Sequence, residues 1–437
     1  MRPFLLKYWE QFRSSFWFVP SLMTGAAAAM AFATVALDRA KTDAWMQILH
    51  WAYTGGAAGA SAVLGTIAGS MITIAGVVFS MTLVALSLTT SQLGPRLLRT
   101  FMSDRANQMV LGTFVATFVY CLLVLRTIRY PDEGAFVPHL SVTLGVLLAL
   151  VSVGVLIYFI HHISRSIQAD VLVARIGREV VEEVDDLYPG RLGKEAEDVP
   201  IIPDAFEEEA RPILAAEDGY VQSIEPGTLI GVATEEDLLF RVERSPGQYV
   251  VAGRPLVLVH PASQITDQIR TRVNSAFLLG PQRTPEQDFE FAVNQLVEIA
   301  VRALSPGVND PFTAVRCVDR LGSALSRLAQ REMPSPYRHD EEGRLRVIAP
   351  VVTFPSVVDV AFDKIRRHAG SGIAVAVRLL ETIPVIAAFV QQPEGRAALQ
   401  EQAEMIVRRA RTEIPEGKDR NAVEDRYHEA IEAIQAP

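Results

Sequence analysis

The sequence lacks charge over one very long stretch. Residues 44–95 contain no Asp, Glu, Lys or Arg, although charged residues make up 21% of the 437-residue chain. A helix of about 20 apolar residues crosses the hydrocarbon core of a bilayer, so this stretch is more than long enough. The missing charge excludes an ordinary soluble protein for the first part of the chain. Residues 161–437, by contrast, have the composition of a soluble protein.

Cysteine is also scarce, and its placement excludes a disulfide framework. Cys121 lies in an apolar segment and Cys317 lies in a predicted soluble helix. Two cysteines in such different surroundings do not form a pair, which indicates a reducing compartment for the second part of the chain.

Four apolar segments predict four membrane crossings. They cover residues 16–37, 59–91, 108–125 and 136–160. Arginine and lysine are most frequent before the first crossing, after the second and after the fourth. Because positive residues are enriched on the cytoplasmic side of a membrane, we expect both termini in the cytoplasm.

Motifs of known chemistry are missing as well. The sequence contains no His-Glu-x-x-His motif, spaced Cys/His cluster, nucleophile elbow or P-loop. We therefore expect no enzyme activity, no cofactor and no metal site. The expected crossings contain no Asp or Glu, which disfavours a proton-coupled transporter. The net charge of −9 comes mainly from the second part and disfavours a nucleic-acid partner.

The domain boundaries follow from changes in composition and periodicity. Residues 1–16 predict an amphipathic helix in the headgroup region, and 17–165 a four-helix transmembrane domain. A helix and an acidic linker occupy 166–200, a small β domain 201–265 and a mainly helical cytosolic domain 266–437. The expected fold class is an α-helical transmembrane bundle joined to a cytosolic α+β region.

The second expected crossing, 59–91, carries hydroxyl side chains at steps of three, four or seven, which places them on one helical face. The candidate pore-lining residues are Thr66, Ser70, Thr73, Gly76, Ser80, Val84, Ser87 and Ser91. This face has three interpretations: hydroxyls bonded to their own i−4 carbonyls beside packed glycines, a pore wall built from copies of the helix, or a static dimer face. In a pore, Arg96 and Arg99 would form positive rings at the mouth.

The expected β domain contains the pattern Gly-x-Tyr-Val-x-x-Gly-x-Pro-Leu at residues 247–256. This pattern resembles strands of barrel-sandwich hybrid domains, the fold of lipoyl and biotinyl carriers. Those carriers attach their cofactor to a lysine, and no lysine occurs between Lys194 and Lys364. The resemblance therefore implies a structural or docking module without a cofactor.

Two soluble helices are expected on either side of a turn at 304–313. Thr284 and Gln287 predict a capping box at the start of the first helix, and Asp310 predicts the N-cap of the second. The candidate ligand-binding residues of the turn are Ser305, Asn309 and Asp310. The alternative is a well-capped turn that binds nothing.

Three stretches resemble one protein family. They are SFWFVP at 15–20, AGSMITIAGVVFSMTLVALSLTTSQLGPRLL at 68–98 and ALSPGVNDPFTA at 303–314. They are similar to an uncharacterised bacterial family of predicted multi-pass membrane proteins, known only as a domain of unknown function. The resemblance covers most of the chain and implies a bacterial inner-membrane location. It assigns no catalytic residue and no substrate.

Two functions of different classes fit these observations. The first is an oligomeric channel in which the helix at 59–91 lines a pore for ions or small solutes. Four helices are too few to enclose a conduit alone, so this function requires a homo-oligomer in the bilayer. The alternative is a membrane-anchored cytosolic scaffold or sensor without transport activity, with an unidentified cytosolic ligand or partner. Bulky replacements along the hydroxyl face would block the channel and would leave the scaffold unaffected.

Overall fold

The computed structural model divides into two compact units, Met1–Val171 and Leu172–Pro437. The residues that it describes are 17–40, 55–93, 104–130, 136–166, 168–188, 202–203, 206–285, 287–370 and 372–436. The expected amphipathic helix at 1–16, Arg96 and Arg99 lie outside the described residues.

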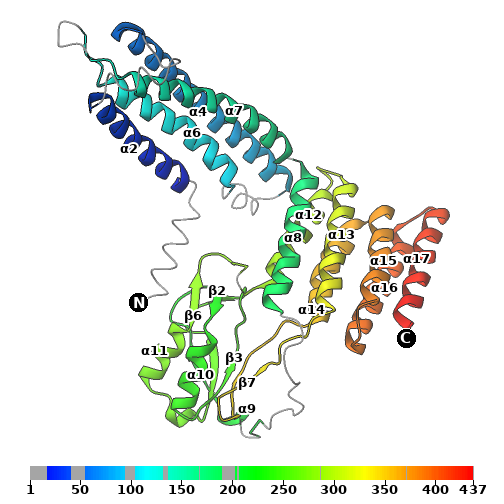
Figure 1. Ribbon diagram of the computed structural model, residues 1–437. Helices are drawn as coiled ribbons and strands as arrows, with labels where there is room; N and C mark the ends of the chain where they lie inside the picture. The colour runs from blue at the N-terminus through cyan, green and yellow to red at the C-terminus, as the bar shows by residue number, and fades with distance from the viewer. Residues whose placement is uncertain are drawn as a thin grey trace. The chain divides into compact units, whose positions relative to one another are not determined.

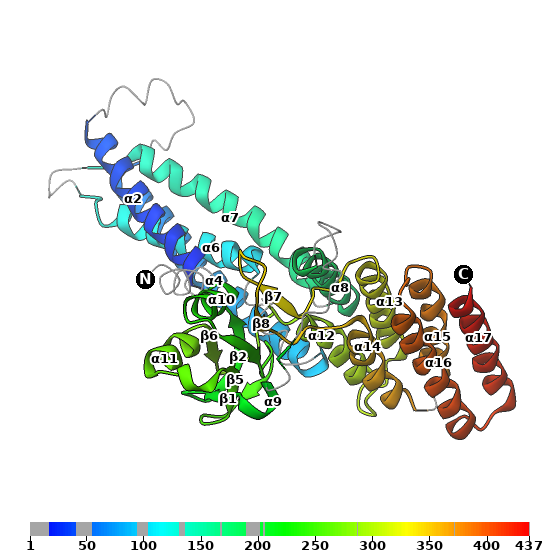
Figure 2. The ribbon, with the colours of Figure 1, turned by 90° about the horizontal axis from the view of Figure 1, so that it is seen from below.

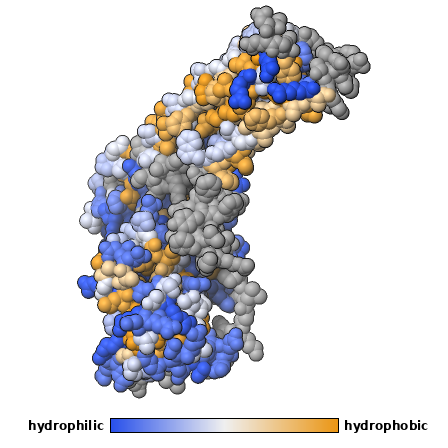
Figure 3. Space-filling view, turned by 90° about the vertical axis from the view of Figure 1, so that its left-hand side faces the viewer, coloured by the Kyte–Doolittle hydropathy of each residue, from blue (hydrophilic) through white to orange (hydrophobic). Residues whose placement is uncertain are grey.

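Among its described residues, the first unit has four helices that are long and apolar enough to cross a membrane, as expected. They are α2 (Phe18–Ala40), α4 (Ala57–Leu93), α6 (Arg105–Leu125) and α7 (His139–Ser166) (Figure 1). The 37 residues of α4 extend about 55 Å, well beyond the thickness of the hydrocarbon core. In Figure 3, hydrophobic side chains cover much of the displayed face of this unit, whereas hydrophilic side chains predominate on the second.

Helix α6 is the centre of the first unit. Within its apolar window 56% of the residues are buried, compared with 28% in each of the other three helices. Close packing depends on glycine at two places. A Cβ at Gly112 would lie 2.6 Å from the sulfur of Met23, and a Cβ at Gly145 would lie 2.9 Å from Cδ2 of Leu64. These glycines therefore hold α2 and α4 close to α6 and α7.

A buried polar network joins α2, α6 and α7. The backbone amides of Leu140 and Ser141 each donate to the carboxylate of Asp38 over 3.0 Å, and the Ser141 hydroxyl donates over 2.6 Å. The Tyr120 hydroxyl donates to the carbonyl of Ser141 (3.0 Å) and lies 3.1 Å from the Thr34 hydroxyl. Asp38 thus caps the N-terminus of α7 from another helix, where a negative charge is favoured.

The described part of the second unit contains two β-sheets. One has the order β1-β5-β3-β8-β7, and the other β4-β2-β6. The strands are β1 (Arg211–Leu214), β2 (Gly219–Ile224), β3 (Leu239–Val242), β4 (Tyr249–Val250), β5 (Pro255–His260), β6 (Phe277–Gly280), β7 (Tyr337–His339) and β8 (Leu345–Ile348). Helices α10 (Pro226–Glu235) and α11 (Asp267–Ser275) contribute Leu229, Val232, Ile269 and Val273 to the apolar core that the strands share. The short α9 (Phe206–Glu209) and a 3-10 turn (Ala262–Gln264) complete this region.

The barrel-sandwich expectation is not confirmed, because the described strands form two open sheets without a closed barrel. The pattern at 247–256 is instead a strand, a turn and a strand, comprising β4 and the start of β5. Gly247 and Gly253 have φ angles of +87° and +80°, a backbone region in which glycine is favoured. Local turn geometry therefore accounts for both glycines.

Strand β8 reaches the larger sheet from far along the chain. It pairs in parallel with β3, with Phe240 opposite Val347, while β7 pairs with β8 in antiparallel fashion. Two long helices, α12 (Phe289–Ala303) and α13 (Pro311–Leu328), lie between β6 and β7 in the chain. The sheets therefore receive strands from both sides of a helical hairpin.

The remaining helices of the second unit are α8 (Ala169–Leu187), α14 (Phe354–Ala369), α15 (Ile373–Ala387), α16 (Pro393–Glu413) and α17 (Gly417–Gln435). Figure 2 shows α13 to α17 grouped together; α15 packs between α13 and α17, and α14 packs against α16. Helix α15 is strongly apolar, and it is not among the candidate membrane spans found in the described residues.

The capping box predicted at Thr284 and Gln287 is wrong. Helix α12 begins at Phe289, and its N-cap is Asp288, which accepts from the amide of Phe291. The side-chain amide of Gln287 binds the backbone of Ile224 instead, over 2.9 and 3.1 Å. The end of strand β2 thus competes successfully with the helix for this side chain.

An acidic residue joins α8 to α13. Both carboxylate oxygens of Asp185 accept from Arg327, at 2.8 and 3.0 Å, and Oδ1 also accepts from Arg331. The hydrogen bonds from Arg327 and then from Arg331 lower the pKa of Asp185 from 3.8 to about 2. Because Asp185 is 39% exposed, solvent weakens the pair, and its contribution to stability is modest.

Replacing Asp38 by alanine is expected to destabilise the first unit by about 1–3 kcal/mol, because the part-buried amide of Leu140 and the buried amide and hydroxyl of Ser141 lose their acceptor. Asp38→Asn keeps one acceptor oxygen and should lose less. Thr113→Ala is a matched control, since the Thr113 hydroxyl is exposed and donates only within its own helix. The free energy of unfolding in mixed micelles is the measurement. Equal stability of the three variants would contradict the network's role.

Replacing Asp185 by asparagine is expected to lower the midpoint of thermal unfolding of the second unit at neutral pH. The folded-state pKa is depressed, so the stabilisation is complete above about pH 4 and is lost as the pH falls toward 2. The difference between variant and wild type should shrink over that interval when followed by circular dichroism. Asp267→Asn is the control, because Asp267 is fully exposed and 3.8 Å from Arg270. A difference that is independent of pH would refute this account.

Candidate functional site

Helix α4 has two chemically different faces. The face that packs into the bundle is apolar apart from Thr82, and its buried residues are Ala60, Leu64, Ala68, Met71, Ala75, Val78, Thr82 and Ala85. The opposite face carries the hydroxyl positions predicted from the sequence. The exposed members are Thr66, Ser70, Thr73, Gly76, Ser80, Val84 and Ser87. Ser91 belongs to α4, but its side chain lies outside the described set. The structure therefore gathers seven of the candidates on one exposed helix face.

The glycines of this face meet nothing in the protomer. A Cβ built at Gly65, Gly69 or Gly76 has no atom within 4 Å, in contrast to Gly112 and Gly145 in the bundle interior. Glycine inside a helix costs about 1 kcal/mol relative to alanine. Packing within one protomer does not offset that cost. The interpretation that these glycines simply pack against neighbouring helices of the same protomer therefore does not apply.

Two threonine hydroxyls of this face are bonded to the i−4 carbonyls of their own helix, as one interpretation of the sequence expects. Thr66 donates to the carbonyl of Ala62 and Thr73 to that of Gly69, both over 2.8 Å. Each hydroxyl keeps an oxygen that is able to accept a further hydrogen bond. The threonines of the exposed face are thus bonded within their own helix and still present a polar oxygen to whatever lies beside it.

The spacing of the exposed face is close to a heptad repeat. Positions 66, 73, 80 and 87 are Thr, Thr, Ser and Ser, and Ser70, Val77 and Val84 repeat at the same interval four residues later. A repeat of 3.5 residues keeps one seam facing a partner helix when helices supercoil in a left-handed sense. The face is therefore patterned for contact along most of its length.

A single bundle encloses no conduit among its described residues. Its centre is filled by Phe114, Tyr120 and Phe159, whose exposed fractions are 0%. Two apolar clusters occupy the space between the helices. Any passage through the protein must therefore lie outside the single bundle.

The turn before α13 holds two of its polar side chains, Ser305 and Asp310, by hydrogen bonds to neighbouring residues. Asp310 caps α13 and accepts from the amide of Thr313 (3.1 Å) and its hydroxyl (2.6 Å). Burial raises the pKa of Asp310, but the hydrogen bonds from Thr313 outweigh it, and the pKa lies below its ordinary value. The Ser305 hydroxyl donates to the carbonyl of Arg302, and Asn309 has a left-handed backbone with φ of +49°. These contacts describe a well-capped turn, and Asp310 as N-cap agrees with the sequence.

Asp38 is the polar residue that the sequence reasoning missed. It lies one position beyond the expected end of the first crossing, yet α2 continues to Ala40 and Asp38 is 7% exposed. Its partners belong to α7, about a hundred residues later. The signal available in the sequence was a lone acid at the end of an apolar run.

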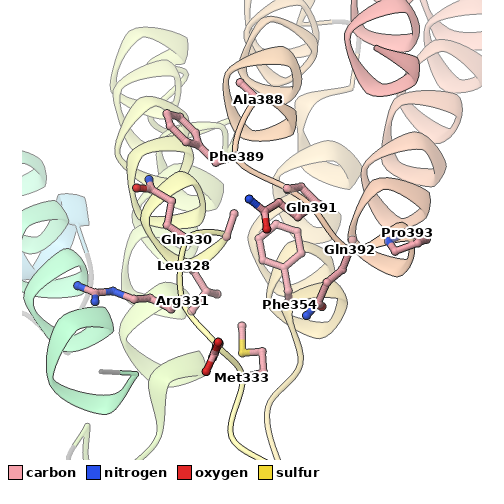
Figure 4. Close-up of a pocket in the computed structure, with 14 residues that line it drawn as sticks. Leu328, Gln330, Arg331, Met333, Phe354, Ala388, Phe389, Gln391, Gln392 and Pro393 are labelled. Carbon is pink, nitrogen blue, oxygen red and sulfur yellow. The ribbon is translucent and has the colours of Figure 1, made fainter. Parts of the chain in front are cut away.

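A cavity of about 500 Å³ lies at the C-terminal ends of α13 and α15. Its lining includes the amides of Gln330 and Gln391 and the ring of Phe354 (Figure 4). Arg331 points away from the cavity toward α8, where it pairs with Asp185. Amide and apolar groups therefore make up most of the lining, which is not a catalytic set. Among the described residues no group of three His, Cys, Asp or Glu side chains is placed to hold a metal ion.

Comparison with known proteins agrees with the membrane assignment. The family described as "Predicted membrane protein (DUF2254)" matches residues 13–384. Uncharacterised proteins of Mycobacterium tuberculosis and Mycobacterium bovis are each 34% identical to this chain over 389 residues, which is 86% of this chain and 73% of the relative. No solved structure matches the chain. The match over most of the sequence confirms the resemblance found at 15–20, 68–98 and 303–314, and the chain belongs to this family of predicted membrane proteins with a domain of unknown function.

Proposed function

We propose that the protein is an oligomeric, channel-like protein of the bacterial inner membrane, in which α4 from several copies lines a path for ions or small solutes. The observation that carries the proposal is the exposed face of α4, where glycines with open space alternate with hydroxyls. In a single protomer this face would lie against acyl chains, which neither pack against glycine specifically nor bond to hydroxyls.

A second copy of α4 would give both the glycines and the hydroxyls a protein neighbour in place of acyl chains. Small residues let helix backbones approach closely in a membrane, and van der Waals packing is the main force that associates membrane helices. The 3.5-residue spacing keeps the same seam in contact over several turns. Gly69 and Gly76, seven residues apart, would then be contact points between neighbouring copies.

The same face has the chemistry of a pore wall. Hydroxyl oxygens such as those of Ser80 and Ser87 replace part of the water around a permeating ion, and apolar rings close a pore by excluding water. Val77 and Val84 are 55% and 58% exposed and lie in the hydroxyl stripe. We assign the hydroxyls to conduction and the valines to closure.

The proposed orientation places both termini and the second unit in the cytoplasm. Arg105, Arg175 and Arg178 follow the second and fourth spans, whereas Arg126 and Arg129 follow the third. Positive residues favour the cytoplasmic side. The proposal assigns the protein no enzyme activity and no cofactor, and it leaves an unidentified ligand or partner to the cytosolic unit.

Disulfide cross-linking tests the oligomer. Ser80→Cys is expected to form covalent dimers in membranes under mild oxidation, because copies of α4 face one another. Leu150→Cys on α7 is the matched control, since Leu150 is 65% exposed on another helix and should stay monomeric. The native Cys121 and Cys317 are both buried and unpaired, so the background is low. Equal cross-linking at both positions would contradict a specific α4 interface.

Electrical recording tests the pore. The wild-type protein in planar bilayers or liposome patches, under voltage or tension, should give unitary currents that are lost in Gly76→Leu. Gly154→Leu on α7 is the matched control, because a Cβ at Gly154 also meets nothing within 4 Å, and it should conduct as the wild type does. Cross-linked oligomers without current would refute conduction and support the alternative, a membrane-anchored scaffold or sensor.

A further inference from the structure

The turn between α12 and α13 lies at the end of the second unit where the chain arrives from the membrane. Two contacts establish this. A Cβ at Gly177 of α8 would lie 2.7 Å from the side chain of Arg320 of α13, and Asp185 pairs with Arg327. Residue numbers rise together along both helices, so α8 and α13 run in the same direction and their N-termini lie at the same end.

Chain lengths place that end near the bilayer. From Gly177 back to Ala169, where α8 begins, is about 12 Å of helix, and from Arg320 back to Pro311 is about 13 Å. The candidate span of α7 ends at Ser164. Five residue steps from there to Ala169 cover at most about 18 Å. The turn before α13 is therefore tied to the membrane by a very short segment.

This turn displays the most exposed large hydrophobic side chain among the described residues. Phe312 is 72% exposed, more than any large hydrophobic residue of the four candidate membrane spans, and Val308 is 41% exposed. The Ser305 hydroxyl and the Asp310 carboxylate are bonded to neighbouring residues, and Asn309 is an exposed polar residue of the turn. Phe312 and Val308 stand beside it as exposed apolar side chains, for which water is an unfavourable environment.

Basic residues flank the apolar pair on both helices. Arg302 lies in the last turn of α12, and Arg316 is an exposed residue of α13. Asp310, the acid of the turn, caps α13. An aromatic side chain accompanied by arginines is the composition of segments that lie in the headgroup region, where anionic phosphates attract the arginines.

We propose that the turn at 305–312 inserts Phe312 and Val308 into the headgroup region of the bilayer that α7 crosses, and so fastens the second unit to the membrane surface. Lipid is the partner that we assign to Phe312 and Val308, because α13 begins at the same end as α8, which follows the last candidate span. The inference does not depend on conduction by α4 and holds for a scaffold as well.

Spin labelling of the full-length protein in liposomes of phosphatidylethanolamine and phosphatidylglycerol tests the contact. Phe312→Cys carries the label, and the buried native cysteines leave the wild type unlabelled. Phe389→Cys is the matched control. Phe389 is also exposed, at 43%, but it follows α15, whose residues Arg378 and Thr382 contact Asp319 and Gly322 of α13 in the same order. It therefore lies at the opposite end of α13.

The readout is the collision of each label with oxygen, which concentrates in lipid, and with a nickel chelate, which stays in water. We expect high oxygen and low nickel accessibility at 312, and the reverse at 389. Equal, water-like accessibility at both positions would overturn the proposal. Low accessibility to both reagents at 312 would also overturn it, because that result identifies a protein surface, such as a second copy, as the occupant.

Discussion

Hydrocarbon offers no hydrogen-bond partner, and the membrane unit is arranged around that constraint. Several of its polar side chains find partners within the unit. Asp38 accepts from the start of α7 and Tyr120 links Thr34 to Ser141 between helices, while Thr66 and Thr73, on the exposed face of α4, bond to their own helix. On the exposed face of α4, the requirement for suitable neighbours is not met within one protomer. A Cβ at Gly65, Gly69 or Gly76 meets no atom within 4 Å, and the hydroxyls point away from the bundle. The proposed oligomer gives this exposed face the protein neighbours that the buried face of α4 already has.

The membrane contact inferred for the turn before α13 would meet a related requirement in the second unit. A soluble domain tied closely to a bilayer has one end whose surroundings are partly lipid, and a fully polar surface there would gain nothing from the contact. In the turn before α13, the Asp310 carboxylate is bonded to Thr313 while Phe312 and Val308 are exposed.

Features with a local signal are predictable from the amino-acid sequence. Apolar length reveals the four crossings, and a period near 3.5 places Thr66, Thr73 and Ser80 on one helical face. Asp310 is recognisable as an N-cap because capping acts over three residues. Contacts between distant residues are not predictable in this way. The local pattern assigns Gln287 to a helix cap, but its side chain binds Ile224, which is distant in the chain, and Asp38 finds its partners on α7. No periodicity indicates that β8 joins β3.

The pairing of β8 with β3 has a mechanical consequence. The hairpin of α12 and α13 leaves the β region after β6 and returns to it through β7 and β8, so both of its ends are anchored in sheets. A force applied at the tip of this hairpin is therefore divided between two attachments to the sheets, one through β6 and one through β7 and β8. At β8 the load meets ladders on both sides, to β3 and to β7, and hydrogen bonds on both edges must shear before the strand slips. Separating the hairpin from the β region therefore requires breaking strand pairing at β8 as well as at β6.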